Sequence, residues 1–325
     1  MIFEKINSNF YLITLIAFAF SALAVWQWIR FSGKESFVQP IREDGNKEHY
    51  KKQGTPMMGG VAFLTVFLLL MILFCGINAR ALLILFSTLG FMAIGFLDDY
   101  EKAKKKVNEG LTPRQKLYLQ FALATVIAIW NYLLNPEAST QVIPFFGWKW
   151  NLGVIWIPIF SFIIVGTANS VNLTDGLDGL CTGVSIPVFF AIAVAGTSLF
   201  STIPEISIGG WIMVGVLLGF LIFNSHPASV FMGDTGSMGI GGALVALLLL
   251  QNHLLYLILL GGVYLMETLS DLIQFAYFRK TGGKRIFLMA PVHHHFELKG
   301  YPEEKVAMSF SLFSAALALC YLWIA

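Results

Sequence analysis

Long uninterrupted apolar segments constrain this chain more than any other feature. The first, FYLITLIAFAFSALAVWQWI from Phe10 to Ile29, has the roughly 20 residues that a helix needs to cross a bilayer. Of the 325 residues, 57% are hydrophobic and 12% charged, whereas soluble domains average about 25% charged residues. Soluble, fibrous and disordered classes are thereby excluded.

The apolar segments predict an all-α polytopic membrane protein, a single domain over residues 1–325 with about ten transmembrane helices. Unbroken apolar runs favour helices over a β-barrel, whose strands alternate apolar and polar residues. One connection, QVIPFFGWKWNLG from Gln141 to Gly153, alternates around Gly147 and predicts a small β-hairpin. The expected span cores are 10–30, 57–76, 80–97, 115–134, 153–170, 179–199, 207–223, 237–252, 254–277 and 305–324.

Charge divides the connections between these spans into two sets. One set carries 18 of the 21 lysines and arginines, which makes it cytoplasmic by the positive-inside rule. With ten spans, both termini then lie outside, as does the predicted hairpin. The same cytoplasmic side holds 16 of the 19 acidic residues, so we expect the catalytic loops there.

Two adjacent carboxylates, Asp98 and Asp99, end the third predicted span in the sequence GFLDDYEKAKKK. Charges at the membrane boundary are costly unless cations or a function hold them. The pair is therefore either a functional site or a set of solvated helix-end charges balanced by the lysines that follow.

A second polar cluster, NSVNLTDGLDG, places Asn169, Asn172, Asp175 and Asp178 at steps of three residues. On helical backbone that spacing keeps neighbouring side chains within reach of one another, and Gly176 permits close approach of a ligand. An all-oxygen site without local cations fits Mg²⁺ or the polar groups of a substrate. The alternative is a structural turn capped by Asn and Asp.

A third motif, NSHPASVFMGDTGS, leads into the eighth predicted span. Its Gly-Asp-Thr-Gly-Ser segment resembles a helix start that receives phosphate on free N–H groups, although Asp234 is also a candidate N-cap. Phe231 either stacks on a base or anchors the loop at the membrane interface. Because several acidic clusters face the same side, we favour a metal-bridged phosphate site.

Three consecutive histidines, His293, His294 and His295, lie in the last cytoplasmic loop, APVHHHFELKG. Zinc motifs space their histidines apart, so a single ion does not easily bind all three. Donors to phosphate oxygens, or a group that handles protons near neutral pH, fit better.

Five motifs in order resemble those of the bacterial phospho-N-acetylmuramoyl-pentapeptide transferases, a branch of the polyprenyl-phosphate N-acetylhexosamine-1-phosphate transferases. The resemblance covers essentially the whole chain, and the triple-histidine segment looks like the muramoyl branch in particular. The motifs are GTPMMGG (54–60), DDYEK (98–102), NSVNLTDGLDGL (169–180), FNSHPASVFMGDTGS (223–237) and APVHHHFELKG (290–300).

The resemblance implies a reaction and its partners. Phospho-MurNAc-pentapeptide would move from UDP-MurNAc-pentapeptide to undecaprenyl phosphate, giving lipid I and UMP in peptidoglycan synthesis, with Mg²⁺ required. It further implies a homodimer in the bacterial inner membrane, an active site facing the cytoplasm, and binding of nucleoside-analogue inhibitors. No nucleic-acid partner is expected.

The resemblance also assigns roles to residues. Asp98, Asp99 and Asp234 match the catalytic aspartates, and Asp234 is the expected Mg²⁺ ligand. Met57 stands where the family usually has threonine, so a hydroxyl contact with inhibitors would be lost. The matched substrate-binding residues are Lys52, Asn172, Asp175, Gly176, Asp178, Asn224, Phe231 (stacking on uracil), Gln274, His293, His294 and His295.

Two other functions are compatible with parts of the sequence. A related transferase would use a UDP-N-acetylhexosamine without the peptide, and the triple-histidine segment argues against it. A secondary transporter would place ionisable groups near the bilayer midplane, where these spans carry few besides Glu267 and Asp271.

Two mechanisms are also open for the transferase. In one, Asp98 deprotonates or orients the lipid phosphate for direct attack. In the other, an aspartate attacks first and forms a phosphoryl-enzyme. We favour direct attack because a phosphate oxygen is already an anionic nucleophile.

Overall fold

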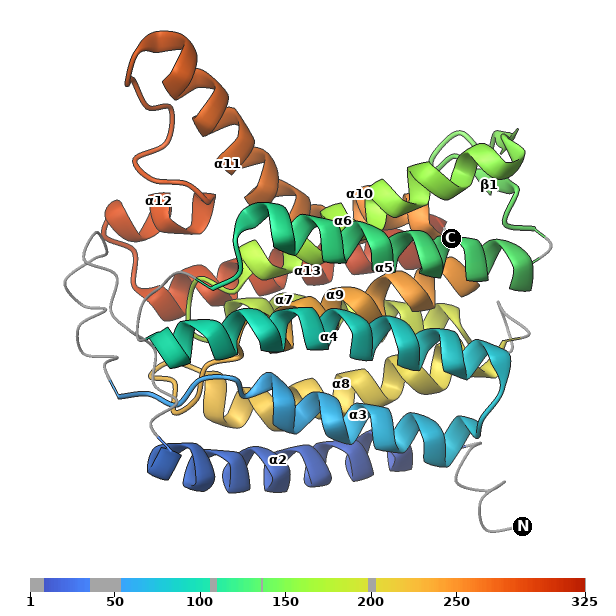
Figure 1. Ribbon diagram of the computed structural model, residues 1–325, viewed down its shortest axis with the longest axis horizontal. Helices are drawn as coiled ribbons and strands as arrows, with labels where there is room; N and C mark the ends of the chain where they lie inside the picture. The colour runs from blue at the N-terminus through green and yellow to red at the C-terminus, as the bar shows by residue number, and fades with distance from the viewer. Residues whose placement is uncertain (1–8, 36–53, 106–109, 136, 198–202, 325) are drawn as a thin grey trace.

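The computed structural model describes residues 9–35, 54–105, 110–135, 137–197 and 203–324, and helices dominate it (Figure 1). Two short strands, β1 (Thr140–Val142) and β2 (Lys149–Asn151), pair antiparallel. The helices are α2 (Phe10–Glu35), α3 (Gly60–Cys75), α4 (Ala79–Lys105), α5 (Pro113–Leu134), α6 (Trp156–Thr174), α7 (Leu180–Ala195), α8 (Pro204–Asn224), α9 (Gly233–Leu250), α10 (Leu257–Leu260), α11 (Gly262–Thr281), α12 (Val292–Leu298) and α13 (Glu303–Ile324), with 3-10 turns η2 (Gly153–Ile155) and η3 (Leu254–Tyr256).

Each predicted span core falls on one or more of these helices. In the described part of the chain, seven helices are long and apolar enough to cross a membrane, and the α10–α11 pair makes an eighth if its 81° bend is allowed. The two remaining cores fall on α3 and α7, which have 16 residues each and are shorter than the roughly 20 of a straight span. The protein is a multi-pass helical membrane protein, and the count of ten spans stays a prediction.

Helix α9 lies at the centre of the bundle, with every residue from Thr235 to Leu250 buried. It packs against α3, α4 and α6. Small residues bring the backbones close: the Ser87 hydroxyl of α4 donates to the Gly242 carbonyl of α9 at 2.7 Å, and Gly241 faces Ala168 of α6. Such contacts are typical of membrane helices, which associate by close packing because lipid supplies no hydrophobic driving force between them.

The polar groups divide between the two ends of the bundle. The end of α4, the start of α9 and α12 lie at one end, and the β1–β2 hairpin lies at the other (Figure 1). At the hairpin end, Asn252, just after α9, donates from its side-chain amide to the Thr140 carbonyl at 3.0 Å. The pairing of β1 with β2 confirms the predicted hairpin. Its position outside the cell and the outside location of the termini stay predictions.

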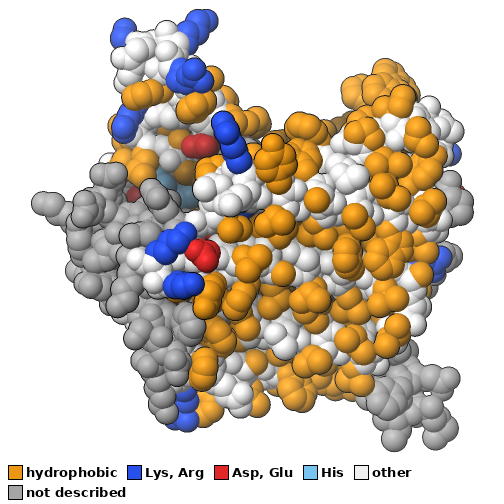
Figure 2. Space-filling view, in the orientation of Figure 1, with side chains coloured by type: hydrophobic (Ala, Val, Ile, Leu, Met, Phe, Trp, Pro, Cys, Tyr) orange, Lys and Arg blue, Asp and Glu red, His pale blue; other side chains and the backbone are white. Residues whose placement is uncertain are grey.

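The flank of the bundle exposes apolar side chains. Figure 2 shows hydrophobic groups over much of this face, whereas lysines and arginines gather at one end and at the tip of α11. On α5, for example, Tyr118 is 77% exposed and Leu133 79% exposed. Large contiguous apolar surfaces mark membrane contact, so this flank is where lipid covers the protein.

Candidate active site

Three aspartates converge where α4 ends and α9 begins. Asp98 and Asp99 are buried in α4, and Asp234 lies in the first turn of α9. One oxygen from each carboxylate lies within 4.8 Å of the other two. The helices approach this closely because residue 95 is glycine: a Cβ there would lie 2.1 Å from the Asp234 carbonyl oxygen.

Asp99 fastens the two helices together. Its carboxylate accepts hydrogen bonds from the backbone N–H groups of Asp234 (3.1 Å) and Thr235 (2.9 Å) and from the Thr235 hydroxyl (2.6 Å). The prediction that these N–H groups receive phosphate was therefore wrong for both residues, because a carboxylate of the protein already occupies them. The N-cap alternative was wrong as well, since α9 has Met232 at that position.

Two lysines bridge the other two aspartates. Lys102 Nζ lies 2.6 Å from Asp98 Oδ2 and 3.1 Å from Asp234 Oδ2. Lys116 Nζ lies 2.6 Å from Asp234 Oδ2 and 3.7 Å from Asp98 Oδ2. The carboxylate oxygens of Asp98 and Asp234 that contact the two lysines are hard donors, and oxygen donors of this kind are the ligands that Mg²⁺ prefers.

The sequence predicts the contact that one of these lysines makes but not the contact that the other makes. Lys102 follows Asp98 by four residues, the spacing of ion pairs along a helix. Lys116 belongs to the first turn of α5, which starts with Pro113 after a capping box between Thr112 and Gln115. In the sequence Lys116 stands out only as part of the basic charge of a loop, because its contact with Asp234 depends on how α5 packs.

Asn172 and Asp175 extend this site from the end of α6. Asn172 Nδ2 donates to Asp234 Oδ1 at 2.8 Å and to the Ser237 hydroxyl at 2.9 Å. Burial, followed by the negative charges of Asp234 and Asp99, raises the pKa of Asp175 to about 8.

The expectation that steps of three bring the whole second cluster together was wrong. Helix α6 ends at Thr174, so the spacing loses its meaning beyond that residue. Asn169 instead exchanges hydrogen bonds with Gln120 of α5, the shorter of them 2.8 Å. Asp178 faces a different set of groups.

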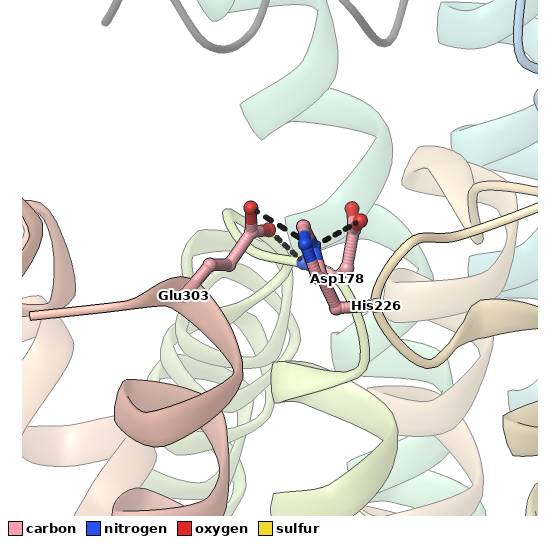
Figure 3. Close-up of side chains that lie close together, drawn as sticks. All are labelled: Asp178, His226 and Glu303. Carbon is pink, nitrogen blue, oxygen red and sulfur yellow. Dashed lines mark hydrogen bonds and ion pairs between the residues drawn. The ribbon is translucent and has the colours of Figure 1, made fainter.

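Asp178 forms a second cluster with His226 and Glu303 (Figure 3). Asp178 Oδ2 lies 3.1 Å from His226 Nδ1 and accepts from the Ala228 N–H at 3.0 Å. The backbone N–H of Asp178 donates to Glu303 Oε1 at 2.6 Å. This cluster links the start of α13 to the turn before α7, and neither His226 nor Glu303 was predicted as a site residue.

The three histidines make three different contacts. His293 Nδ1 lies 3.0 Å from Glu267 Oε2. His294 Nδ1 lies 2.6 Å from Glu297 Oε2. His295 Nδ1 accepts from the Leu288 N–H at 3.0 Å, which holds the loop before α12.

The proposed nucleoside residues also have structural partners. Asn224 is buried, accepts from the Thr182 hydroxyl at 2.7 Å and donates to the Val230 carbonyl at 3.1 Å. Gln274 accepts from the backbone N–H groups of Ile286 and Phe287 and donates to the Phe287 carbonyl, all between 3.0 and 3.1 Å.

The loop before α9 pairs with the GTPMMGG segment. The Phe231 N–H donates to the Pro56 carbonyl at 2.8 Å, and its carbonyl accepts from the Gly59 N–H at 2.9 Å. Met57 is 4% exposed, and its carbonyl accepts from Trp28 Nε1 at 3.0 Å. Lys52 lies outside the described residues.

Comparison with known proteins identifies the family of the chain. The sequence profile of glycosyl transferase family 4 matches residues 81–252. A phospho-N-acetylmuramoyl-pentapeptide-transferase from Thermodesulfovibrio yellowstonii is 42% identical over 98% of this chain and 93% of its own length. Proteins of the same description from Clostridium acetobutylicum and Clostridioides difficile are 44% and 43% identical, each over 94% of this chain and over 95% and 94% of their own lengths. The chain therefore belongs to glycosyl transferase family 4, and specifically to the phospho-N-acetylmuramoyl-pentapeptide-transferases.

Proposed function

We propose that this protein transfers phospho-MurNAc-pentapeptide from UDP-MurNAc-pentapeptide to undecaprenyl phosphate, forming lipid I and releasing UMP in peptidoglycan synthesis. The observation that carries the proposal is the convergence of Asp98, Asp99 and Asp234 with Lys102 and Lys116 at one end of the helical bundle. The lipid substrate keeps its tail in the bilayer and its phosphate at the surface. A site where the spans end reaches that phosphate.

The electrostatics of the site suit a reaction between two anions. Two phosphate groups repel each other at close range, and the ammonium groups of Lys102 and Lys116 offset that repulsion. Asp234 would hold Mg²⁺, and Asp98 lies close enough to contribute a second carboxylate oxygen. When bound, the ion supplies charge neutralisation on the phosphates and on the departing UMP.

Direct attack remains the favoured mechanism. An oxygen of the lipid phosphate bonds to the phosphorus that carries the sugar, and the bond from that phosphorus to UMP breaks. Asp98 is the residue placed to deprotonate or orient the lipid phosphate. Asp99 is a poor nucleophile because its two oxygens already accept three hydrogen bonds.

The remaining matched residues complete the donor site in this proposal. Phe231 stacks on uracil, and a nucleoside pocket surrounds it. The end of the donor site that holds the phosphates contains His293, His294 and His295, together with Asp175 and Gly176. The other pocket residues are Lys52, Asp178, Asn224 and Gln274. Loss of the threonine hydroxyl at Met57 would alter the binding of nucleoside-analogue inhibitors.

The same proposal covers the setting of the enzyme. The chain is one membrane domain over residues 1–325, crosses the bacterial inner membrane ten times and keeps both termini outside. The site faces the cytoplasm, where the nucleotide donor is made. The working unit is a homodimer.

UMP release from defined substrates tests the proposal. Purified protein in detergent should release UMP when UDP-MurNAc-pentapeptide, undecaprenyl phosphate and Mg²⁺ are all present, and a labelled lipid product should form in equal amount. UDP-N-acetylglucosamine serves as the comparison donor. Transfer from the comparison donor alone would instead assign the protein to the related UDP-N-acetylhexosamine branch.

A further inference from the structure

We propose that Glu267 is a positioning residue, which holds His293 so that its Nε2 atom can donate a hydrogen bond to a phosphate oxygen of the bound nucleotide donor. The inference rests on the proposed function and adds a residue to it. In the sequence, Glu267 stands out only as an acid within a predicted span.

The two side chains form a buried pair. Glu267 of α11 is 0% exposed and His293 of α12 is 1% exposed. Glu267 Oε2 lies 3.0 Å from His293 Nδ1, and the backbone N–H of His293 donates to the same oxygen at 3.4 Å. One carboxylate oxygen therefore contacts both the ring and the backbone of His293, which fixes the position of the ring.

The other ring nitrogen of His293 faces the DGLDG turn. A Cβ at Gly176 would lie 2.1 Å from His293 Nε2, so only glycine leaves room for the ring there. Within the described part of the chain, this buried Nε2 has no hydrogen-bond partner. Buried polar atoms without partners are uncommon in proteins, and this one lies beside the turn that follows Asn172 and Asp175.

Glu267 influences which hydrogen bonds His293 Nε2 can form. An ionised carboxylate only accepts hydrogen bonds, so His293 Nδ1 carries its hydrogen toward Glu267. When both ring nitrogens carry a hydrogen, Nδ1 donates to Glu267 while Nε2 can donate to a phosphate oxygen. Carboxylates that orient histidines in this way occur in hydrolase triads and around metal ligands.

The second carboxylate oxygen of Glu267 supports a role beyond packing for the Glu267–His293 pair. Glu267 Oε1 is buried and lacks a partner among the described residues. A pair kept only for stability would be expected to satisfy its polar atoms, because a buried polar atom without a partner is destabilising. The arrangement instead leaves Nε2 buried and unpaired among the described residues, beside the turn of the proposed donor site.

The test compares kcat and KM in the transfer assay for the wild type and Glu267→Gln. The variant keeps the size of the side chain and removes its charge. We expect kcat to fall about 10-fold to 100-fold, the range found when the partner of a functional histidine is altered. The KM for UDP-MurNAc-pentapeptide and the melting temperature in detergent should stay close to wild type. Asp271→Asn, one turn further along α11, is the matched control and should keep wild-type kcat.

A double variant separates positioning from an independent role. If Glu267 acts through His293, the pair Glu267→Gln with His293→Gln should be no slower than His293→Gln alone. Multiplied losses in the double variant would overturn the proposal, as would an unchanged kcat in Glu267→Gln, or a lowered melting temperature with kcat retained. If the wild type itself releases no UMP, the proposed function fails first and the inference with it.

Discussion

The Asp99 carboxylate accepts both the backbone N–H and the hydroxyl of Thr235, at 2.9 and 2.6 Å. This one contact sets the end of α4 against the start of α9. Asp98, its neighbour in sequence, points instead to Lys102 and to the backbone N–H of Leu111. Two adjacent aspartates therefore make different contacts: Asp99 holds the start of α9, whereas Asp98 contacts Lys102 and the loop before α5.

That difference predicts different results for the two asparagine variants. Asp99→Asn replaces an acceptor oxygen with an amide donor next to N–H groups, so it should lose transfer activity and about 1–3 kcal/mol of stability. Asp98→Asn should lose transfer activity with little change in melting temperature. UMP release and thermal melting in detergent measure both properties. Equal melting temperatures for the two variants would contradict the structural role of Asp99.

Lys116 should contribute to transfer activity through the positive charge that it places beside Asp234. Lys116→Gln removes the ammonium group that lies 2.6 Å from Asp234 Oδ2, so kcat should fall on the order of a hundredfold, as when one stabilising donor is removed from an active site. Lys105→Gln is the control, because that lysine is half exposed and pairs with Glu101 at 2.8 Å on the outside of α4. A variant at Lys116 as active as the one at Lys105 would remove the lysine from the site.

The close approach of α4 and α9 should depend on Gly95. A methyl group at this position meets the Asp234 backbone at 2.1 Å, so Gly95→Ala should destabilise the protein by about 1–3 kcal/mol and abolish transfer. Gly166→Ala is the matched control: it is also helical, and a Cβ there meets nothing within 4 Å. Thermal melting and transfer rates of the two alanine variants compare them directly. Wild-type activity in Gly95→Ala would show that the helices do not need this contact.

His253 predicts a pH dependence of stability at the opposite end of the bundle. Burial lowers the pKa of this histidine from 6.5 to about 4, and its Nδ1 lies 2.8 Å from the Tyr321 hydroxyl. Between these two values the unfolded chain binds a proton that the folded protein does not. Stability should therefore be lost as the pH falls from about 6.5 toward 4, because linkage favours the state that binds more protons.

Melting temperatures of the wild type and His253→Gln across this pH range measure the effect. The variant lacks the titrating ring, so its melting temperature should fall less steeply with decreasing pH. Parallel curves would show that His253 does not account for the pH dependence.

Much of the fold could be predicted because lipid imposes a length on apolar segments. The ten predicted cores all coincide with helices, and Gly147 marks the hairpin correctly. The bend between α10 and α11 was missed because residues 254–277 read as one apolar run, although Gly261 and Gly262 stand at the break. The short lengths of α3 and α7 were missed because apolar residues continue past their ends.

The site was predictable where a motif is local and was missed where it depends on packing. Asp98, Asp99 and Asp234 are visible as acids at span ends. Lys116 reaches Asp234 across 118 residues of sequence, which no local spacing reveals. Glu267 and His293 are separated by 26 residues and a loop, so the histidine motif was visible in the sequence but its pairing with Glu267 was not.

Transfer activity titrated with Mg²⁺ in the wild type and in Asp234→Asn, with melting temperatures measured alongside, tests the central claim most directly. We predict that the wild type saturates with Mg²⁺, whereas the variant stays folded and releases UMP on the order of a hundredfold more slowly at the same Mg²⁺ concentration. Equal rates and equal Mg²⁺ dependence in the two proteins would contradict the claim that the carboxylates joining α4 and α9 form the transfer site.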